Sequence, residues 1–391
     1  MREVVIVEAV RSPLGKRNGG LSAMHAIDLL GTVQAELIKR SGIDPALVGQ
    51  VVGGCVGQVG MQTMNVARNA WLTAGLPLEV AATTVDAQCG SSQQATNMAY
   101  ALIAAGVVDI AVGCGVEMMS RVPMGATAPK DPDVGKPINK GYWKRYEFTS
   151  QFEGGERIAK KWGIGRQDTD AFGKQSQDRA AAAWAEGRFD AQIVAIDAPD
   201  WTADGKPAET THRVARDEGL RATTLEALGG LRTNLPDGIH TAGTSSQVSD
   251  GAAAVLMMTR ERAAELGLRA RATVVDVCLV GADPVLMLTG PIPATRKLLA
   301  DNKMAMSDVD LVEINEAFAS VVLAWEKELK PDMNRVNPNG GAIAVGHPLG
   351  GTGAVLLTKA VHELERANKE LALVTMCCGG GLGTGTLLRR G

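Results

Sequence analysis

The stretch Val85–Ala95 reads VDAQCGSSQQA and places a cysteine, Cys89, at a turn between two kinds of sequence. The run before it (82–87) predicts a strand, and the run after it (91–106) predicts a helix. Ligands of open α/β sheets bind at the carboxyl ends of strands, and a helix N-terminus is expected to lower the pKa of a thiol. Gly90 leaves room for a second molecule. Cys89 is therefore either a nucleophile or a buried structural cysteine.

The same alternation of strand and helix continues on both sides of this stretch. It predicts an α/β protein whose sheets are covered by helices on both faces. The predicted strands are 4–9, 50–56, 82–87, 108–115, 250–260, 271–281, 309–319 and 369–380. The predicted helices outside the middle of the chain are 26–42, 63–75, 91–106, 295–302 and 351–368.

The middle of the chain has a different composition, with more proline, charged residues and tryptophan, and it contains few strand-like runs. It contains an amphipathic helix pattern at 166–187. We therefore predict an N-terminal half at 1–118 that is completed by about 244–268, an inserted and mostly helical loop domain at 119–243, and a C-terminal half at 269–391. The two α/β halves resemble each other, which suggests an internal duplication.

Composition limits the class of protein. The chain has 391 residues, 45% hydrophobic residues and a formal net charge of −3, so nothing favours a nucleic acid or a membrane surface as partner. Six cysteines in so long a chain do not resemble a disulfide framework, and no spacing of Cys or His suggests a metal site. The first residues read as a strand rather than a signal peptide. We expect a reduced, cytoplasmic enzyme.

Three further residues lie in settings suited to chemistry. His347 is framed by glycines in NPNGGAIAVGHPLGGTGA (337–354), where it is a general base or a hydrogen-bonded loop histidine. Asn315 follows an apolar strand, where it binds a water or substrate oxygen or caps the next helix. Cys377 ends a strand and enters CCGGGLGTGT, where it is a second reactive cysteine or plain core. His25, His212, His240 and His362 have no comparable setting.

The glycines after Cys377 also superficially suggest a dinucleotide-binding turn. That interpretation is weak, because only a short strand-like run follows and no helix is left to receive a pyrophosphate. An NAD enzyme is therefore disfavoured.

Together these segments resemble the thiolase family over essentially the whole chain. The resemblance rests on DAQCGSS around Cys89, NEAFA from Asn315, the glycine-framed segment of His347 and MCCGGGLGTG around Cys377, supported by RSPLGK, GVEMMSR and GTSSQVSDGAAAV. It implies a thiolase fold: two similar α/β halves in an αβαβα layering, plus the inserted loop domain.

The resemblance also implies catalytic roles. Cys89 would carry the acyl group, His347 would deprotonate it, and Cys377 would be the second acid and base. Asn315, holding a water, would form one oxyanion hole with His347, and the N–H groups of Cys89 and Gly379 would form the other. Cys378 occupies a variable position of the motif and is expected to pack.

Contacts with substrate are implied less specifically. Ser246 would lie beside the pantetheine of CoA and Arg221 beside the adenine, although a helix cap and a solvated surface charge are their ordinary alternatives. Met287 and Phe318 would line the acyl pocket, or they are plain core. The same resemblance adds Gly243 and Ala317 to the binding surface.

The expected activity is CoA-dependent cleavage of a 3-ketoacyl-CoA to acetyl-CoA or propionyl-CoA and a shortened acyl-CoA, in fatty-acid or sterol side-chain degradation. QFEGGERIAKKWGI (151–164) and GTSSQVSDG (243–251) depart from the pattern of short-chain biosynthetic members and favour a bulkier acyl group. A biosynthetic acetoacetyl-CoA thiolase and a non-catalytic lipid or CoA carrier are the alternatives. CoA is expected as co-substrate, with no bound cofactor or metal, in a homodimer or homotetramer.

Overall fold

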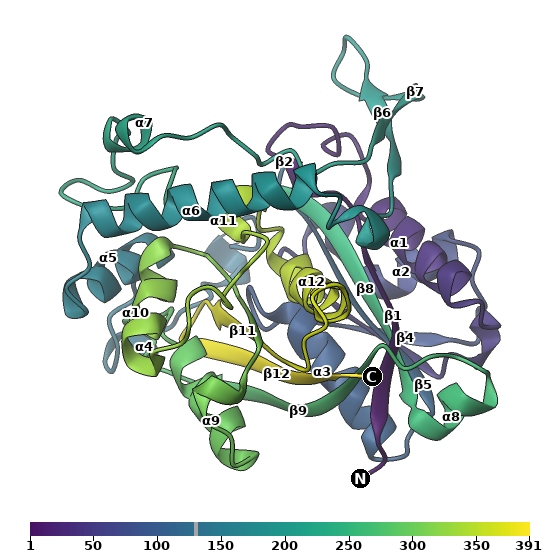
Figure 1. Ribbon diagram of the computed structural model, residues 1–391. Helices are drawn as coiled ribbons and strands as arrows, with labels where there is room; N and C mark the ends of the chain where they lie inside the picture. The colour runs from purple at the N-terminus through teal and green to yellow at the C-terminus, as the bar shows by residue number, and fades with distance from the viewer. Residues whose placement is uncertain (129–131) are drawn as a thin grey trace.

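The computed structural model describes residues 1–128 and 132–391, and Figure 1 shows their arrangement. The strands are β1 (Val4–Arg11), β2 (Gly15–Lys16), β3 (Gln50–Gly54), β4 (Ala81–Val85), β5 (Ile110–Met118), β6 (Ile196–Trp201), β7 (Pro207–Val214), β8 (Ser249–Thr259), β9 (Ala272–Gly281), β10 (Leu311–Ile314), β11 (Leu371–Cys378) and β12 (Leu382–Arg390). The helices are α1 (Ala26–Ser41), α2 (Val66–Thr73), α3 (Ser91–Ala104), α4 (Lys140–Trp143), α5 (Gln151–Lys161), α6 (Arg166–Ala185), α7 (Leu225–Gly229), α8 (Arg260–Glu265), α9 (Pro291–Asp301), α10 (Ala319–Leu329), α11 (Ala342–Val345) and α12 (Thr352–Arg366).

The main strands form two sheets with the same pairing pattern. In the first half, β4-β3-β5 are parallel and β5-β8-β1 are antiparallel. In the second half, β10-β11 are parallel and β11-β12-β9 are antiparallel, and Val336 adds a parallel bridge to Val312 at the outer edge. A short pairing of β1 with β9 joins the sheets into one path. The predicted similarity of the two halves is confirmed.

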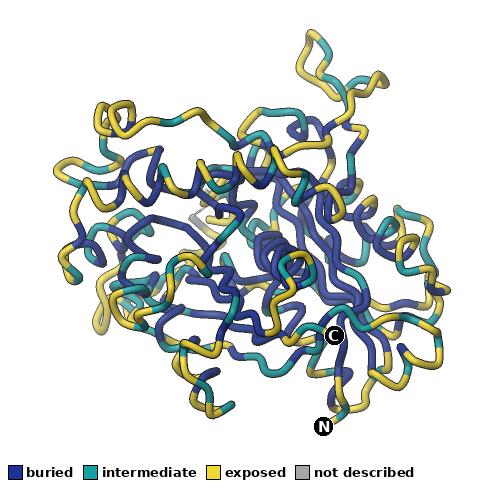
Figure 2. Tube along the Cα trace, viewed as in Figure 1, coloured by how far each residue is buried: buried dark blue, intermediate teal, exposed yellow. Residues whose placement is uncertain are grey.

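Three layers of helices enclose the two sheets (Figure 1). Helices α1 and α2 cover one outer face, α9 and α10 cover the other, and α3 and α12 lie between the sheets. Alternate side chains of β8 show why: Leu256 and Met258 join the α1–α2 core, whereas Val255 and Met257 join the α3–α12 core. The predicted αβαβα layering is therefore confirmed. Figure 2 shows the resulting depth of burial, with α12 and the strands beside it almost continuously buried.

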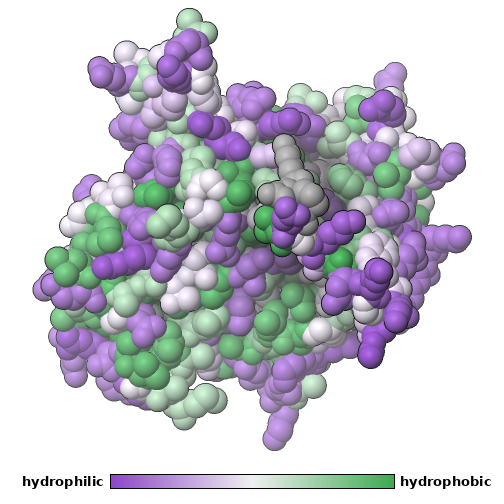
Figure 3. All heavy atoms as spheres, turned by 180° about the vertical axis from the view of Figure 1, so that it is seen from behind, coloured by the Kyte–Doolittle hydropathy of each residue, from purple (hydrophilic) through white to green (hydrophobic). Residues whose placement is uncertain are grey.

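The segment between β5 and β8 contains helices α4 to α7, as predicted, and also a two-stranded sheet of β6 and β7, which the sequence analysis missed. The sequence of β7, PAETTHRV, is almost entirely exposed and has no apolar face that would have indicated a strand. The hairpin stands off the body and carries mostly hydrophilic side chains, as Figure 3 shows from behind. The residue limits 119–243 of the loop domain stay a prediction.

Candidate active site

A tight turn between β4 and α3 presents Cys89. Gln88, the residue before it, has a φ of 53°, a left-handed conformation that few residues other than glycine adopt. Asp86 stabilises this conformation by accepting the Gln88 N–H at 2.7 Å. Ser91 closes the turn, because its hydroxyl donates to the Gln88 carbonyl at 2.6 Å and accepts the Ala87 N–H at 3.0 Å. The strained turn therefore holds the cysteine backbone in one place.

The sulfur of Cys89 lies in an environment that favours the neutral thiol. Burial raises its pKa to about 11, although the N–H groups of Gly379 and of Cys89 itself face the sulfur and act in the opposite direction. The charges of Glu117 and Asp86 add to the rise. The N–H groups at this turn act to lower the pKa, but burial outweighs them and the net shift is upward.

His347 is held by its backbone and by its ring. Gly346 before it has a φ of 119°, and a Cβ there would lie 2.4 Å from the Ser249 hydroxyl, so only glycine fits. That hydroxyl accepts the His347 N–H at 3.0 Å. The ring Nδ1 lies 2.6 Å from Oγ1 of Thr352. Burial lowers the pKa of His347 to about 4, so the imidazole is neutral at pH 7 and can accept a proton.

Asn315 connects the histidine to the second cysteine. It follows β10 directly, and its Nδ2 lies 3.4 Å from Nε2 of His347. The same side chain hydrogen-bonds the sulfur of Cys377. Within the described ranges, its Oδ1 is buried and has no hydrogen-bond partner. A buried amide oxygen of this kind suits a bound water or a substrate group.

Cys377 lies at the end of β11, fully buried, in a different environment from its neighbour. Burial and the nearby Cys89 thiol raise its pKa well above the ordinary value. Because side chains alternate across a strand, Cys377 joins an apolar cluster with Phe318, whereas Cys378 joins the α3–α12 core. The packing position predicted for Cys378 is confirmed.

The two halves of the fold bring these groups together. Cys89 lies just before α3 and His347 just before α12, at corresponding points of the repeated pattern. The helices meet at their N-terminal ends: the Ala354 N–H donates to the Ser92 hydroxyl at 2.9 Å, and a Cβ on Gly353 would lie 2.2 Å from the backbone N of Gln93. The N-terminal ends of α3 and α12, which follow Cys89 and His347 in the chain, therefore lie against each other.

Most of the predicted binding residues lie next to this group. Ala317, Phe318 and half-buried Met287 belong to the apolar cluster that contains Cys377. Ser246 is attached to them, because its N–H donates to the Ala317 carbonyl at 2.9 Å.

Arg221 and Gly243 lie on the adjoining segments. The Arg221 guanidinium donates to the Ala242 carbonyl at 3.1 Å, and its backbone N–H donates to Gln177 at 3.0 Å. The side chain of Arg221 is otherwise exposed, and the neighbouring Gly243 is buried.

Several residues that build the site are not among those predicted from the sequence. Thr352 and Ser249 hold His347. Thr352 lies in the same glycine-rich segment as His347, which is its only sequence signal, whereas Ser249 is distant in sequence and approaches His347 only in the fold. Glu117 accepts the N–H groups of Val56, Gly57 and Gly350, which joins the two halves. A lone acid in the apolar strand IAVGCGVEM was the available signal.

His240 was grouped with the unremarkable histidines, yet it lies at the apolar cluster. It is buried, and its ring packs edge-on against Phe318 with the two ring centroids 5.3 Å apart. Its Nδ1 lies 2.9 Å from Oε1 of Glu156. Burial acts to raise the pKa of Glu156, but hydrogen bonds from the ring and backbone of His240 and from Ile239 outweigh it and lower the pKa. The pair therefore packs against the apolar cluster that contains Cys377.

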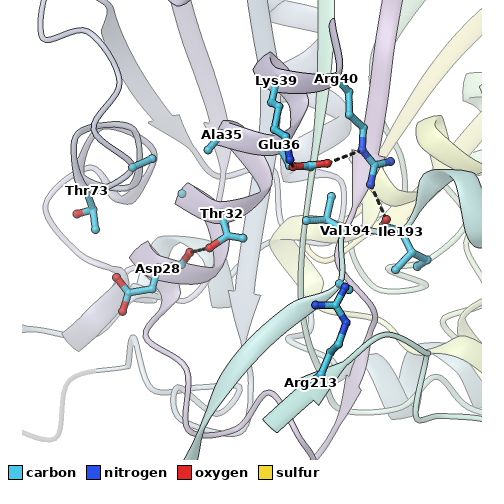
Figure 4. A pocket seen from close by; sticks show the side chains of 13 residues that line it. Asp28, Thr32, Ala35, Glu36, Lys39, Arg40, Thr73, Ile193, Val194 and Arg213 are labelled. Carbon is cyan, nitrogen blue, oxygen red and sulfur yellow. Dashed lines mark hydrogen bonds and ion pairs between the residues drawn. The ribbon is translucent and has the colours of Figure 1, made fainter. Parts of the chain in front are cut away.

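Other features of the molecule lie apart from these groups. Among residues 1–128 and 132–391, no three His, Cys, Asp or Glu side chains are grouped so that they could hold a metal ion. Over the same residues, no helix is long and apolar enough to cross a membrane. A hollow of about 640 Å³ lies on the outer face between α1, α2 and the base of the β6–β7 hairpin, and it contains none of the predicted site residues (Figure 4).

Comparison with known proteins identifies the family. Family models described as "Thiolase, N-terminal domain" and "Thiolase, C-terminal domain" match residues 4–261 and 268–390. A steroid 3-ketoacyl-CoA thiolase of Mycobacterium tuberculosis is 44% identical and covers 100% of this chain and 95% of its own. A 3-ketoacyl-CoA thiolase of Bacillus subtilis is 39% identical over 98% of both chains.

The solved structures agree. The crystal structure of the Bacillus anthracis acetyl-CoA acetyltransferase matches with a TM-score of 0.91 and 36% identity, covering 100% of this chain and 99% of that one. The resemblance found in the sequence is confirmed, and the chain belongs to the thiolase family.

Proposed function

We propose that the protein is an acyltransferase that cleaves a 3-ketoacyl-CoA with CoA, through an acyl intermediate on Cys89. One observation carries the proposal: segments from both halves bring Cys89, His347, Asn315 and Cys377 to one place. Thiolytic cleavage needs a nucleophile, a base, an oxyanion site and a second proton donor, and these four residues supply those groups.

The first step is attack of the Cys89 sulfur on the keto carbon. At pH 7 the resting pair is a neutral thiol and a neutral imidazole, since their pKa values are about 11 and about 4. Nε2 of His347 takes the thiol proton as the sulfur–carbon bond forms. The resulting oxyanion lies on the carbon bonded to the Cys89 sulfur, and the N–H groups of Cys89 and Gly379, which face that sulfur, stabilise it. Loss of one such donor costs about 100- to 1000-fold in rate.

The second step breaks the carbon–carbon bond and leaves the acyl group on Cys89. The departing enolate of acetyl-CoA takes a proton from the Cys377 thiol. Its thioester oxygen is stabilised by the protonated His347 and a water on Asn315. Cys377 then takes the proton of an incoming CoA thiol, and that CoA releases the acyl group.

The substrate class follows from the relatives and the pocket. The curated relatives include thiolases named for steroid 3-ketoacyl-CoA, 3-ketoacyl-CoA and β-ketoadipyl-CoA, which favours a degradative role. In this proposal Met287 and Phe318 line the acyl site, Ser246 lies beside the pantetheine and Arg221 beside the adenine, and Ala317 and Gly243 belong to the same binding surface. The name of the Bacillus anthracis structure supports a second candidate, acetoacetyl-CoA synthesis.

CoA enters as a co-substrate, and no bound cofactor, metal, nucleic acid or membrane is part of the proposal. We place the protein in the cytoplasm, where its thiols stay reduced. We further propose a homodimer or homotetramer paired through the first half, because β4 is the edge strand of the sheet and is only partly covered.

The test is CoA-dependent loss of a 3-ketoacyl-CoA, comparing acetoacetyl-CoA with long-chain and steroid-side-chain substrates, with Cys89→Ala alongside. We expect turnover that the variant abolishes, with greater kcat/KM on the bulkier substrates. Preference for acetoacetyl-CoA would instead support the biosynthetic candidate. Absence of turnover on every substrate, with CoA still bound, would overturn the proposal in favour of a carrier.

A further inference from the structure

Thr352, the first residue of α12, makes two contacts through one hydroxyl. Its Oγ1 lies 2.6 Å from Nδ1 of His347 and 2.8 Å from the carbonyl oxygen of Pro348. Thr352 and His347 are both buried, so water does not compete for these contacts. A hydroxyl carries a single proton and can donate only one hydrogen bond. The direction of the contact with the histidine therefore depends on where that proton goes.

The contact on the other side of the imidazole indicates the direction. Nε2 faces Nδ2 of Asn315 at 3.4 Å, and an amide nitrogen donates but does not accept. Nε2 is then the acceptor of the neutral ring, and Nδ1 carries the proton. Thr352 accepts that proton's hydrogen bond and gives its own to Pro348, in a chain that runs from Nδ1–H through the hydroxyl to the carbonyl.

We propose that Thr352 is a positioning residue that holds the proton on Nδ1 of His347 and so keeps Nε2 free as the base. The inference rests on the proposed function, in which His347 deprotonates Cys89. The same hydrogen bond stabilises the imidazolium formed when the thiol proton arrives, because a charged donor makes a stronger hydrogen bond than a neutral one. Thr352 thus favours the active tautomer before proton transfer and the charged ring after it.

The other half of the molecule supports this assignment. Ser91 is the first residue of α3, as Thr352 is of α12. Its hydroxyl donates to the carbonyl of Gln88 and accepts the N–H of Ala87, so it braces the turn that presents Cys89. A hydroxyl at the start of each central helix therefore orders the reactive residue that precedes it.

The experiment compares Thr352→Val, which keeps the shape and removes the hydroxyl, with Thr352→Ser, which keeps the hydroxyl. Thr358→Val is the matched control, because Thr358 is a buried threonine of the same helix whose hydroxyl donates four residues back, to Ala354, at 2.8 Å. We expect kcat of Thr352→Val to fall about 10- to 100-fold with KM changed less than about twofold, the serine variant to recover most of the activity, and Thr358→Val to keep it.

Alkylation of Cys89 by iodoacetamide supplies a readout independent of turnover. In the wild type Nε2 accepts the Cys89 proton directly, and both groups stay neutral between their pKa values of about 4 and about 11. The alkylation rate should therefore be nearly constant from pH 6 to 9. In Thr352→Val that rate should fall about 10- to 100-fold at neutral pH. The two rates should converge as pH approaches the thiol pKa of about 11, where the base is no longer needed.

Two outcomes would overturn the inference. One is an unchanged alkylation profile in Thr352→Val. The other is an equal loss of kcat in Thr352→Val and Thr358→Val, which would mean that the hydroxyl only stabilises the helix. Failure of the proposed function is separate, because a wild type without thiolase turnover still reports the tautomer through alkylation.

Discussion

At the scale of single residues, adjacent side chains of one strand have opposite environments. Cys377 and Cys378 are neighbours in β11, but the first faces the apolar cluster beside Cys89 and the second is packed under Gly90, where a Cβ on the glycine would lie 2.6 Å from its sulfur. Identical residue types therefore separate into a proposed proton donor and a packing residue through strand alternation alone.

This difference predicts the effect of two matched substitutions. Cys377→Ala removes the proposed proton donor, so kcat for thiolysis should fall at least about 1000-fold, and because Cys377 is fully buried the substitution should also cost about 1–2 kcal/mol in the free energy of unfolding. Cys378→Ala leaves a small cavity, so it should cost about 1–2 kcal/mol in the free energy of unfolding while kcat stays within about threefold. Kinetics and urea unfolding of both variants measure this. Similar kcat values for the two variants would contradict the assignment.

His362 predicts a pH dependence of stability. Burial, followed by the charge of Arg271, lowers its pKa to about 4, against the rise caused by its hydrogen bond to Ala9. A pKa that is lowered in the folded state contributes stability that is fully present at pH values above the unfolded-state pKa of about 6.5. This contribution is lost as the pH falls from 6.5 towards 4.

The measurement is the free energy of unfolding of the wild type minus that of His362→Gln. Between pH 8 and pH 5 this difference should fall by about 2 kcal/mol, because only the wild-type unfolded chain gains a proton at position 362. A difference that stays constant over this range would show that the histidine is not buried in its neutral form.

At the scale of elements, the meeting of α3 and α12 decides whether the site forms. Gly353→Ala would place a Cβ 2.2 Å from the backbone N of Gln93, which no side-chain rotation relieves. The substitution should cost at least about 3 kcal/mol in stability, or should push the helices apart and lower kcat more than about 100-fold.

Gly229→Ala in α7 is the control, because a Cβ there meets nothing within 4 Å. It should leave stability and turnover within error or slightly improve stability, as alanine favours a helix. Thermal unfolding and steady-state kinetics check both variants. Wild-type behaviour of Gly353→Ala would contradict the tight contact between the helices.

Elements with a clear apolar period were predictable, whereas those held by tertiary context were not. The strands around Cys89 and Cys377 and helices such as α1 and α12 follow the expected ranges within a few residues. The β6–β7 hairpin was missed because its exposed polar sequence carries no strand signal. Cys89, His347 and Cys377 were predicted from their glycine-rich turns and Asn315 from its place after an apolar strand, and the roles proposed for all four come from the family resemblance.

The supporting residues could not be found in this way. Thr352, Ser249 and Glu117 act through contacts between distant segments, which one sequence does not record. The raised pKa of Cys89 was also beyond sequence reasoning, because it depends on how completely the two halves enclose the sulfur.

At the scale of the whole molecule, the duplicated halves divide the chemistry. The first half carries Cys89, the proposed nucleophile, and the second carries His347, Asn315 and Cys377, so neither half contains all four residues of the proposed site. The first half also carries the edge strand β4, which pairs only with β3 in the described sheet and whose Ala82 carbonyl accepts a hydrogen bond from the Asn65 side chain.

We therefore predict that light scattering gives the mass of a dimer or tetramer. Thr83→Lys, which adds a charge to an exposed position of β4, should shift the mass towards the monomer because two like charges would face each other across a symmetric strand pair. A monomeric wild type would contradict the proposed assembly.

The most direct test of the account is to trap the acyl group on Cys89. The protein is mixed with a 3-ketoacyl-CoA in the absence of free CoA, quenched in acid, digested and examined by mass spectrometry. The account predicts the acyl mass on the peptide that contains Cys89, its absence in Cys89→Ala, and its loss when CoA is added before the quench. An acyl group on Cys377 instead, or turnover without any acyl-enzyme, would contradict it.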